Sequence, residues 1–147
     1  MKFEHNPRCF PLDSEAKMVD GKRVYATPDG EYYPSITTVI GNNAKKQAGL
    51  AKWRARVGKE KAAAISSRSA SRGTKFHSIT EDYLNNELDI EKYKDSPLPV
   101  VMFEQTKKTF DRIGNIYLQE AFLYSKHLEV AGRVDLVAVF DGELSII

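Results

Sequence analysis

The chain has 147 residues and a formal net charge of +2, and its length fits one domain with a single core. Hydrophobic residues make up 41% of the sequence and charged residues 29%, which excludes a disordered polymer. No stretch approaches the roughly 20 apolar residues that cross a bilayer, and the N-terminus has no secretory signal. We therefore expect an intracellular protein without a membrane partner. The single cysteine, Cys9, excludes an internal disulfide and a thiol-based metal site.

The first third of the chain predicts a hairpin and a short helix. Residues 1–22 form an N-terminal extension, and residues 23–33 contain two β-prone runs around a Pro-Asp-Gly turn. Pro34 and Ser35 then end the strand and cap a helix that reaches about Gly41.

Helix-forming residues dominate from Leu50 to about Leu88, and Gly58 and Gly73 divide this stretch into two or three helices. Near its end, apolar residues at helical spacing predict a core face: Phe76, Ile79, Tyr83 and Leu84. A second helical pattern follows a polar connection and ends near Gly114; its members are Val100, Phe103, Lys107, Phe110 and Ile113.

The last part of the chain changes to a strand pattern. Residues 117–125, 131–140 and 143–147 are rich in β-prone residues, and Asp141-Gly142 is a strong hairpin turn between the last two runs. Helices followed by a three-stranded meander indicate an α/β or α+β domain whose sheet is mostly C-terminal.

A strongly basic block lies in the helical region. Only one acid, Glu60, accompanies its ten cations: Lys45, Lys46, Lys52, Arg54, Arg56, Lys59, Lys61, Arg68, Arg72 and Lys75. Such a block can bind phosphates, and a solvated helix face explains it equally well.

Four residues are candidates for chemistry. His77 and Glu81 are four residues apart on a predicted helix and share one face, as a site or as an ordinary surface pair.

Asp135 interrupts an otherwise apolar strand. Burial of its carboxylate requires a cation or several donors, and a strand-edge aspartate bonded to backbone amides is the alternative. Gly132 and Arg133 precede it and leave space for a ligand. Because side chains alternate along the preceding strand, the Glu120 side chain can point to the same site as Asp135 or to solvent.

These ligand types favour a hard cation. Carboxylates with one imidazole suit Mg²⁺ or Mn²⁺ better than zinc, because the sequence has no cysteine cluster and no His-Glu-x-x-His motif. Such an ion polarises a phosphodiester and helps to generate hydroxide.

The order of several short motifs resembles a known family. They are Tyr33-Pro34-Ser35-Ile36-Thr37-Thr38-Val39, Trp53 with Val57-Gly58, Arg72-Gly73-Thr74-Lys75-Phe76-His77 with Glu81, Gln119-Glu120, and Ala131-Gly132-Arg133-Val134-Asp135. Together they resemble RecB-type PD-(D/E)XK nucleases, most of all the mitochondrial genome maintenance exonucleases and their phage relatives. The resemblance covers almost the whole chain from Arg23 onward.

This resemblance implies a restriction-endonuclease-like core, with helices packed on a mixed central β-sheet. It implies that His77 and Asp135 bind the catalytic Mg²⁺ or Mn²⁺, that Glu120 lies near the metal and that Glu81 is a neighbour. The expected substrate is single-stranded DNA or DNA ends. The cations expected to follow its backbone are Lys52, Arg54, Arg56, Arg68, Arg72 and Lys75, with Trp53 or Tyr83 either stacked on bases or packed in the core.

The family also places an Asp/Glu-x-Lys motif on the strand after the Asp141-Gly142 turn, and the sequence ends before such a motif. We therefore expect a truncated, inactive fragment of an exonuclease, whose exposed sheet edge near Leu144 favours self-association. Two other functions stay open: a non-catalytic module that binds nucleic acid or a protein partner, and a small-molecule metal hydrolase. DNA against RNA preference is not predicted.

Overall fold

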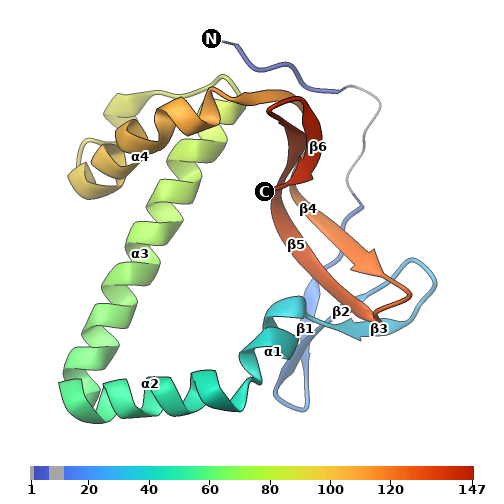
Figure 1. Ribbon diagram of the computed structural model, residues 1–147, viewed down its shortest axis with the longest axis vertical. Helices are drawn as coiled ribbons and strands as arrows, with labels where there is room; N and C mark the ends of the chain where they lie inside the picture. Colours follow the sequence, from blue (N-terminus) through green and yellow to red (C-terminus); the bar gives the residue numbers. More distant parts are fainter. Residues whose placement is uncertain (1, 7–11) are drawn as a thin grey trace. The chain divides into compact units, whose positions relative to one another are not determined.

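The computed structural model describes residues 2–6 and 12–147 (Figure 1), so Cys9 lies outside the described part. These residues form two compact units. The first unit contains residues 2–6, 57–116 and 138–145, and the second contains residues 12–56, 117–137 and 146–147. We describe each unit by itself.

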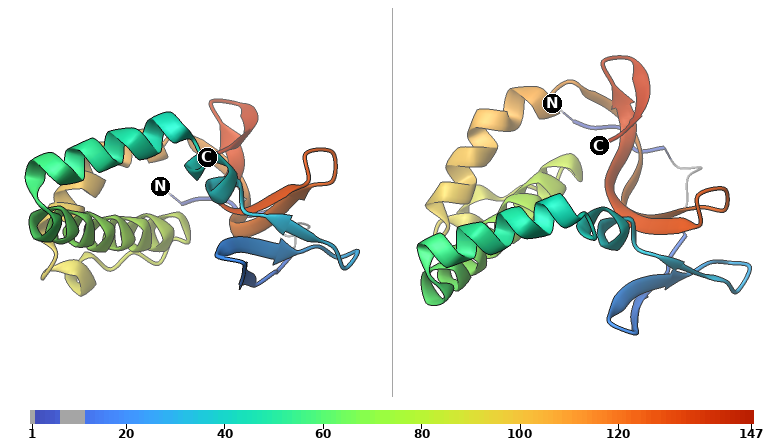
Figure 2. Two further views of the ribbon diagram at one scale, coloured as in Figure 1. Left: turned by 90° about the horizontal axis from the view of Figure 1, so that it is seen from below. Right: turned by 60° about the horizontal axis from the view of Figure 1, so that its bottom comes forward.

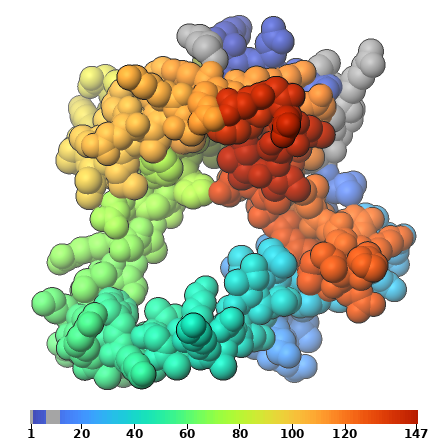
Figure 3. Space-filling model, viewed as in Figure 1, coloured from blue at the N-terminus to red at the C-terminus, as the bar shows by residue number. Residues whose placement is uncertain are grey.

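Two helices build the core of the first unit. They are α3 (Lys59–Leu84) and α4 (Pro97–Phe110), and a short 3-10 helix, η1 (Ile90–Tyr93), lies between them in the chain. Ile79 of α3 and Phe103 of α4 are fully buried in one cluster, with partly buried Phe76, Tyr83 and Phe110 around them. Figure 3 shows the orange side chains of α4 beside the yellow-green end of α3. The predicted apolar face is therefore confirmed as core.

The N-terminal segment is fixed to this core by polar contacts. The backbone N–H of Phe3 donates to Asn86 Oδ1 at 2.7 Å, and Asn86 Nδ2 donates to the Phe3 carbonyl at 3.0 Å. His5 forms a parallel bridge with Ile116, and its Nε2 lies 2.9 Å from the Leu84 carbonyl oxygen. The segment thus adds a short extended piece beside the start of a strand.

The second unit contains a small antiparallel sheet of β1 (Ala16–Val19), β2 (Lys22–Ala26) and β3 (Tyr32–Pro34), visible from two sides in Figure 2. The predicted hairpin is confirmed as β2 and β3. Strand β1, inside the predicted extension, was not expected. After β3 come α1 (Ile36–Gly41), which has Ser35 as its N-cap residue, and α2 (Ala44–Val57).

A second sheet follows, formed by the long strands β4 (Ile113–Ser125) and β5 (Val130–Phe140) and the short strand β6 (Glu143–Ile146), paired in the order β4-β5-β6. The predicted turn is confirmed, because Asp141 and Gly142 have φ values of 51° and 89°. Two positive φ angles match the right-handed twist of the flanking strands. β6 is an outer strand of this sheet, as predicted for the edge near Leu144, and the Leu144 side chain is 66% exposed.

Two details of the sequence prediction are wrong. Gly73 lies inside α3, and only Gly58, with a φ of 92°, separates it from α2. A single glycine is tolerated in a helix, whereas a left-handed residue ends one. Ile113 belongs to β4, not to the preceding helix, which ends at Phe110.

The fold class is confirmed at the level of helices combined with strands. Both three-stranded sheets are antiparallel. Within the described ranges, no helix has the length and apolar character needed to span a membrane.

Candidate metal-binding site

Two carboxylates of the second unit lie close together. Glu120 is on β4 and Asp135 is on the adjacent strand β5, and an oxygen of each lies within 4.8 Å of the other. Because the two strands are neighbours, residues fifteen positions apart can share one side of the sheet. The expected convergence of these two acids is therefore found.

The backbone at Glu120 is unusual for a strand. Its φ is 46°, in the left-handed region. The alternation of β4 breaks at this point, because the next two residues, Ala121 and Phe122, are both buried, at 0% and 2% exposure. An irregularity of this kind redirects a side chain, and left-handed backbone in a residue with a β-carbon is a cost that accumulates at functional sites.

Asp135 is exposed, so the expected burial of its carboxylate is wrong. The neighbouring strand residues explain this result: Leu136 and Ala138 turn one side of β5 into the core, at 3% and 0% exposure, while Arg133 and Asp135 point to the other side. The apolar run is buried on one face only. The argument for metal binding therefore depends on the proximity of Glu120 and not on desolvation.

Gly132 packs closely against α1, because a β-carbon at this position would lie 2.9 Å from Cγ2 of Ile36. Gly132, Arg133 and Ile36 also line an open pocket of about 300 Å³, so the expected space beside the glycine is present. The Arg133 guanidinium is also engaged, since its Nη2 donates to Asp13 Oδ1 at 3.1 Å. Both residues serve contacts within the second unit.

His77 and Glu81 lie on α3 in the first unit, and both are exposed. Each is two residues from the buried Ile79, about 200° around the helix. The pair therefore shares the side of α3 that faces away from α4, as its spacing predicts. Within the second unit, Glu120 and Asp135 each offer one carboxylate oxygen as a metal ligand.

The predicted phosphate-binding cations are all exposed, in two groups. Those on α2 of the second unit are Lys52, Arg54 and Arg56, and those on α3 of the first unit are Arg68, Arg72 and Lys75. The α3 residues and Lys61 recur at intervals of 7, 4 and 3, which places them on one face of the helix. We call these four residues, Lys61, Arg68, Arg72 and Lys75, the basic stripe of α3; composition alone does not show that they share one face.

Tyr83 belongs to the core and not to a base-stacking surface. Its ring makes edge contacts with Phe3 and Phe103, each at a centroid distance of 5.1 Å. Its hydroxyl donates to Asp111. Burial of the hydroxyl is the larger cause that raises the pKa of Tyr83, and this hydrogen bond is the second. Trp53 is half-buried on α2, so its role stays a prediction.

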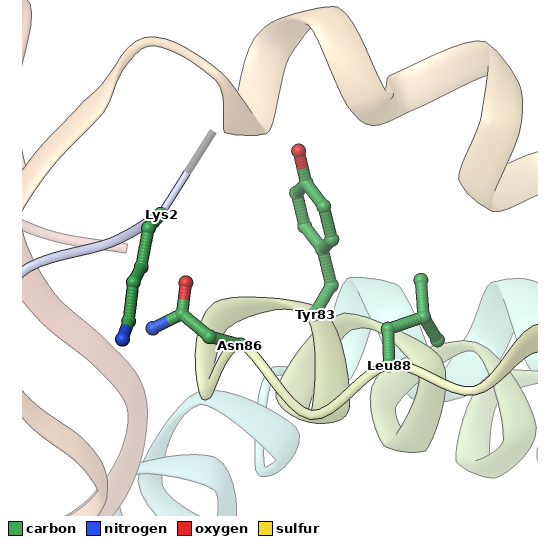
Figure 4. A pocket seen from close by; sticks show the side chains of 4 residues that line it. All are labelled: Lys2, Tyr83, Asn86 and Leu88. Carbon is green, nitrogen blue, oxygen red and sulfur yellow. The ribbon is translucent and has the colours of Figure 1, made fainter.

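A cavity of about 480 Å³ lies at the end of α3 in the first unit, lined by Lys2, Tyr83, Asn86 and Leu88. Figure 4 shows the Tyr83 hydroxyl directed toward α4, and this hydroxyl donates a hydrogen bond to Asp111, the residue that follows the helix. The Asn86 amide holds Phe3. Because its two neutral polar side chains are committed to the fold, this cavity is not a candidate for chemistry.

Comparison with known proteins adds no family assignment. No family model matches the chain, and no curated protein shows significant sequence similarity to it.

Proposed function

We propose that the chain is part of a metal-dependent DNA exonuclease of the PD-(D/E)XK superfamily with a restriction-endonuclease-like core. It would hydrolyse phosphodiester bonds at single-stranded DNA ends. The observation that carries the proposal is the pair of carboxylates, Glu120 and Asp135, held on adjacent strands. The order of motifs from Tyr33 to Asp135 is the second support.

The donor set fits Mg²⁺ or Mn²⁺. Both ions prefer oxygen ligands, and bonds of about 2.1 Å place opposite ligands about 4.2 Å apart. The two carboxylate oxygens lie within 4.8 Å of one another, so a small side-chain rotation brings both onto one ion. Such an ion, when bound, polarises the scissile phosphate and lowers the pKa of a coordinated water.

His77 would supply a third ligand through its ring nitrogen, with Glu81 one helical turn away on the same face of α3. The proposal for these two residues depends on the motif resemblance and on their shared exposure. The resemblance gives His77 the role of orienting the ion relative to the substrate phosphate, from the exposed face of α3.

The remaining protein groups have limited roles. Residues 136–147 contain no lysine, so we assign activation of the attacking water to none of them. The basic stripe of α3 (Lys61, Arg68, Arg72 and Lys75) would hold the DNA backbone by charge, without reading sequence.

A nuclease assay tests the function. A 5′-labelled single-stranded oligonucleotide is incubated with Mg²⁺ or Mn²⁺ and the chain, and in parallel with the gene product that includes any residues encoded after Ile147. We expect metal-dependent shortening by that gene product, which Asp135→Asn abolishes and which Glu104→Gln, the neutralisation of an exposed acid on α4, leaves unchanged. Cleavage by neither protein, with circular dichroism showing both folded, contradicts the proposal.

A spectroscopic experiment tests His77. Electron spin echo measurements on bound Mn²⁺ detect coupling to an imidazole nitrogen, and we expect His77→Gln to remove it. His127→Gln is the matched control, because His127 is an exposed histidine in the turn between β4 and β5. Coupling that persists in His77→Gln assigns the nitrogen elsewhere and removes His77 from the site.

A second candidate is a nucleic-acid-binding module without catalysis, favoured by the basic stripe on α3. It predicts salt-sensitive oligonucleotide binding that Arg68→Ala and Arg72→Ala weaken, together with no metal-dependent cleavage. Cleavage abolished by Asp135→Asn would exclude it.

A further inference from the structure

One face of the β1-β2-β3 sheet carries cations and an open aromatic ring. Strand register puts Lys17 opposite Val24, Val24 opposite Pro34, and Ala26 opposite Tyr32. Residues opposite one another, and residues two apart on a strand, share a face. This lysine-tyrosine face therefore consists of Lys17, Val19, Lys22, Val24, Ala26, Tyr32 and Pro34.

On the opposite face of the same sheet, the part formed by Tyr25 of β2 and Tyr33 of β3 turns into the core. Tyr25 and Tyr33 are paired across β2 and β3, and they are 6% and 7% exposed. They pack with Phe122 and Ala131 of the C-terminal strands in one cluster. The lysine-tyrosine face is therefore the outer face of the sheet.

Tyr32 presents its ring on this outer face. Its side chain is 53% exposed, although burial of a tyrosine ring commonly contributes to stability. Lys17 Nζ lies 5.5 Å from the ring centroid and 3.4 Å from the hydroxyl oxygen. The lysine thus steadies one side of the ring and brings a positive charge next to it.

Protection of a sheet edge accounts for only part of this pattern. A lysine on an edge strand discourages pairing with another chain, which explains Lys17 on β1. Lys22 lies on β2, the central strand of the sheet, where no edge needs protection. The two lysines are the only charged residues that the three strands place on this face; Glu15 and Asp20 flank β1 outside the strands.

We propose that the lysine-tyrosine face binds single-stranded nucleic acid, with a base stacked on Tyr32 and with Lys17 and Lys22 against the phosphates. Sites for single strands combine an exposed aromatic platform with nearby cations. Protein interfaces are depleted in lysine, so this composition favours a nucleic acid over a protein. The inference rests on the proposed function for its ligand class and adds a contact surface separate from the carboxylate pair.

Oligonucleotide binding in EDTA tests the inference without cleavage or metal. Fluorescence anisotropy with a labelled oligothymidylate gives Kd at several salt concentrations. We expect Tyr32→Ala to weaken binding about 5-fold or more, the lower range for loss of one stacked base, and Tyr32→Phe to stay close to the unaltered chain. Replacing Lys17 and Lys22 by alanine together should reduce the salt slope by about 1.4, which corresponds to two phosphate contacts.

Matched controls come from the other face of the same strands. Met18, 67% exposed, pairs with Arg23 on the opposite face, and Arg23 follows Lys22 directly in β2. Met18→Ala should leave Kd unchanged, and Arg23→Ala should change the salt slope less than Lys22→Ala. The inference is wrong if the chain does not bind single strands, if Met18→Ala equals Tyr32→Ala, or if duplex DNA binds as tightly as single-stranded DNA.

These experiments distinguish failure of this inference from failure of the proposed function. A Tyr32-dependent Kd in EDTA together with no metal binding at Glu120 and Asp135 supports the face and rejects the nuclease. Metal binding with an unchanged Kd in Tyr32→Ala does the reverse. Photo-cross-linking of an oligonucleotide that carries 5-iododeoxyuridine should label the peptide that contains Tyr32, and labelling only elsewhere overturns the inference.

Discussion

The carboxylate oxygens of Glu120 and Asp135 lie within 4.8 Å of one another, although fifteen positions separate the two residues. Adjacent strands explain why they meet, and the left-handed backbone of Glu120, with a φ of 46°, marks the point where β4 departs from regular alternation. Two like charges held this close favour a cation between them. Backbone and electrostatics therefore both single out this position.

Replacement of Glu120 by glycine tests whether its backbone is strained. Left-handed conformation costs a residue with a β-carbon about 1–2 kcal/mol, and glycine removes this cost. We expect Glu120→Gly to have a Tm at or above that of Glu120→Ala, measured by circular dichroism without metal. Both variants lack the carboxylate, so the comparison isolates the backbone. A lower Tm for the glycine variant would show that the conformation is not strained.

Gly132→Ala should destabilise the second unit. Its new methyl group would lie 2.9 Å from Cγ2 of Ile36, closer than side chains tolerate. We expect a loss of about 1–3 kcal/mol in the free energy of unfolding, from urea titration. In an Ile36→Ala background the same substitution should cost clearly less, because the clashing methyl is gone. Equal costs in both backgrounds would contradict the contact.

Tyr33 should make stability sensitive to alkaline pH. Its hydroxyl donates to Glu31 Oε2 at 2.6 Å, and this hydrogen bond raises the pKa of Tyr33 from 10.0 to about 12. The folded chain holds this proton more tightly than the unfolded chain, so the contribution is complete below pH 10 and lost as pH rises to about 12. Between pH 9 and 12 the free energy of unfolding, measured by urea titration, should fall more steeply for the unaltered chain than for Tyr33→Phe. Parallel curves would exclude the linkage.

The Tyr83–Asp111 hydrogen bond should make stability sensitive to acid pH. The Tyr83 hydroxyl hydrogen bond, with the Lys107 ammonium, keeps the pKa of Asp111 below its usual 3.8. This contribution is present above pH 3.8 and disappears as pH falls through the folded pKa. Tyr83→Phe should cost about 1 kcal/mol at pH 7, measured by urea unfolding, and less at pH 2.5. A cost independent of pH would mean that lost packing explains the effect.

Local signals in the sequence predicted much of the fold. The Asp141-Gly142 turn, the break at Gly58 and the core face around Ile79 all follow from short-range chemistry, and the structure confirms them. Strand β1 was not expected, because all four of its residues are exposed and carry no alternating pattern. Exposed strands depend on pairing, which a sequence does not display.

The site was predicted less completely, for two physical reasons. Glutamate has no preference for left-handed backbone, so nothing in the sequence marks Glu120 as irregular. The close packing of Gly132 against Ile36 was not predicted either, because Ile36 lies 96 positions earlier in the chain. Residue types indicated the chemistry, while tertiary contacts decided which positions are open.

A Mn²⁺ titration followed by electron paramagnetic resonance tests the central claim most directly, since the signal of free Mn²⁺ falls as the ion binds. We predict one site per chain, and at least about 10-fold weaker binding in the double variant Glu120→Gln with Asp135→Asn, because even loss of an outer-sphere partner costs this much. Neutralising two exposed acids of the first unit, Asp95 and Glu104, should change nothing. Equal Mn²⁺ affinity in all three proteins, or no binding to the unaltered chain, would contradict the metal centre.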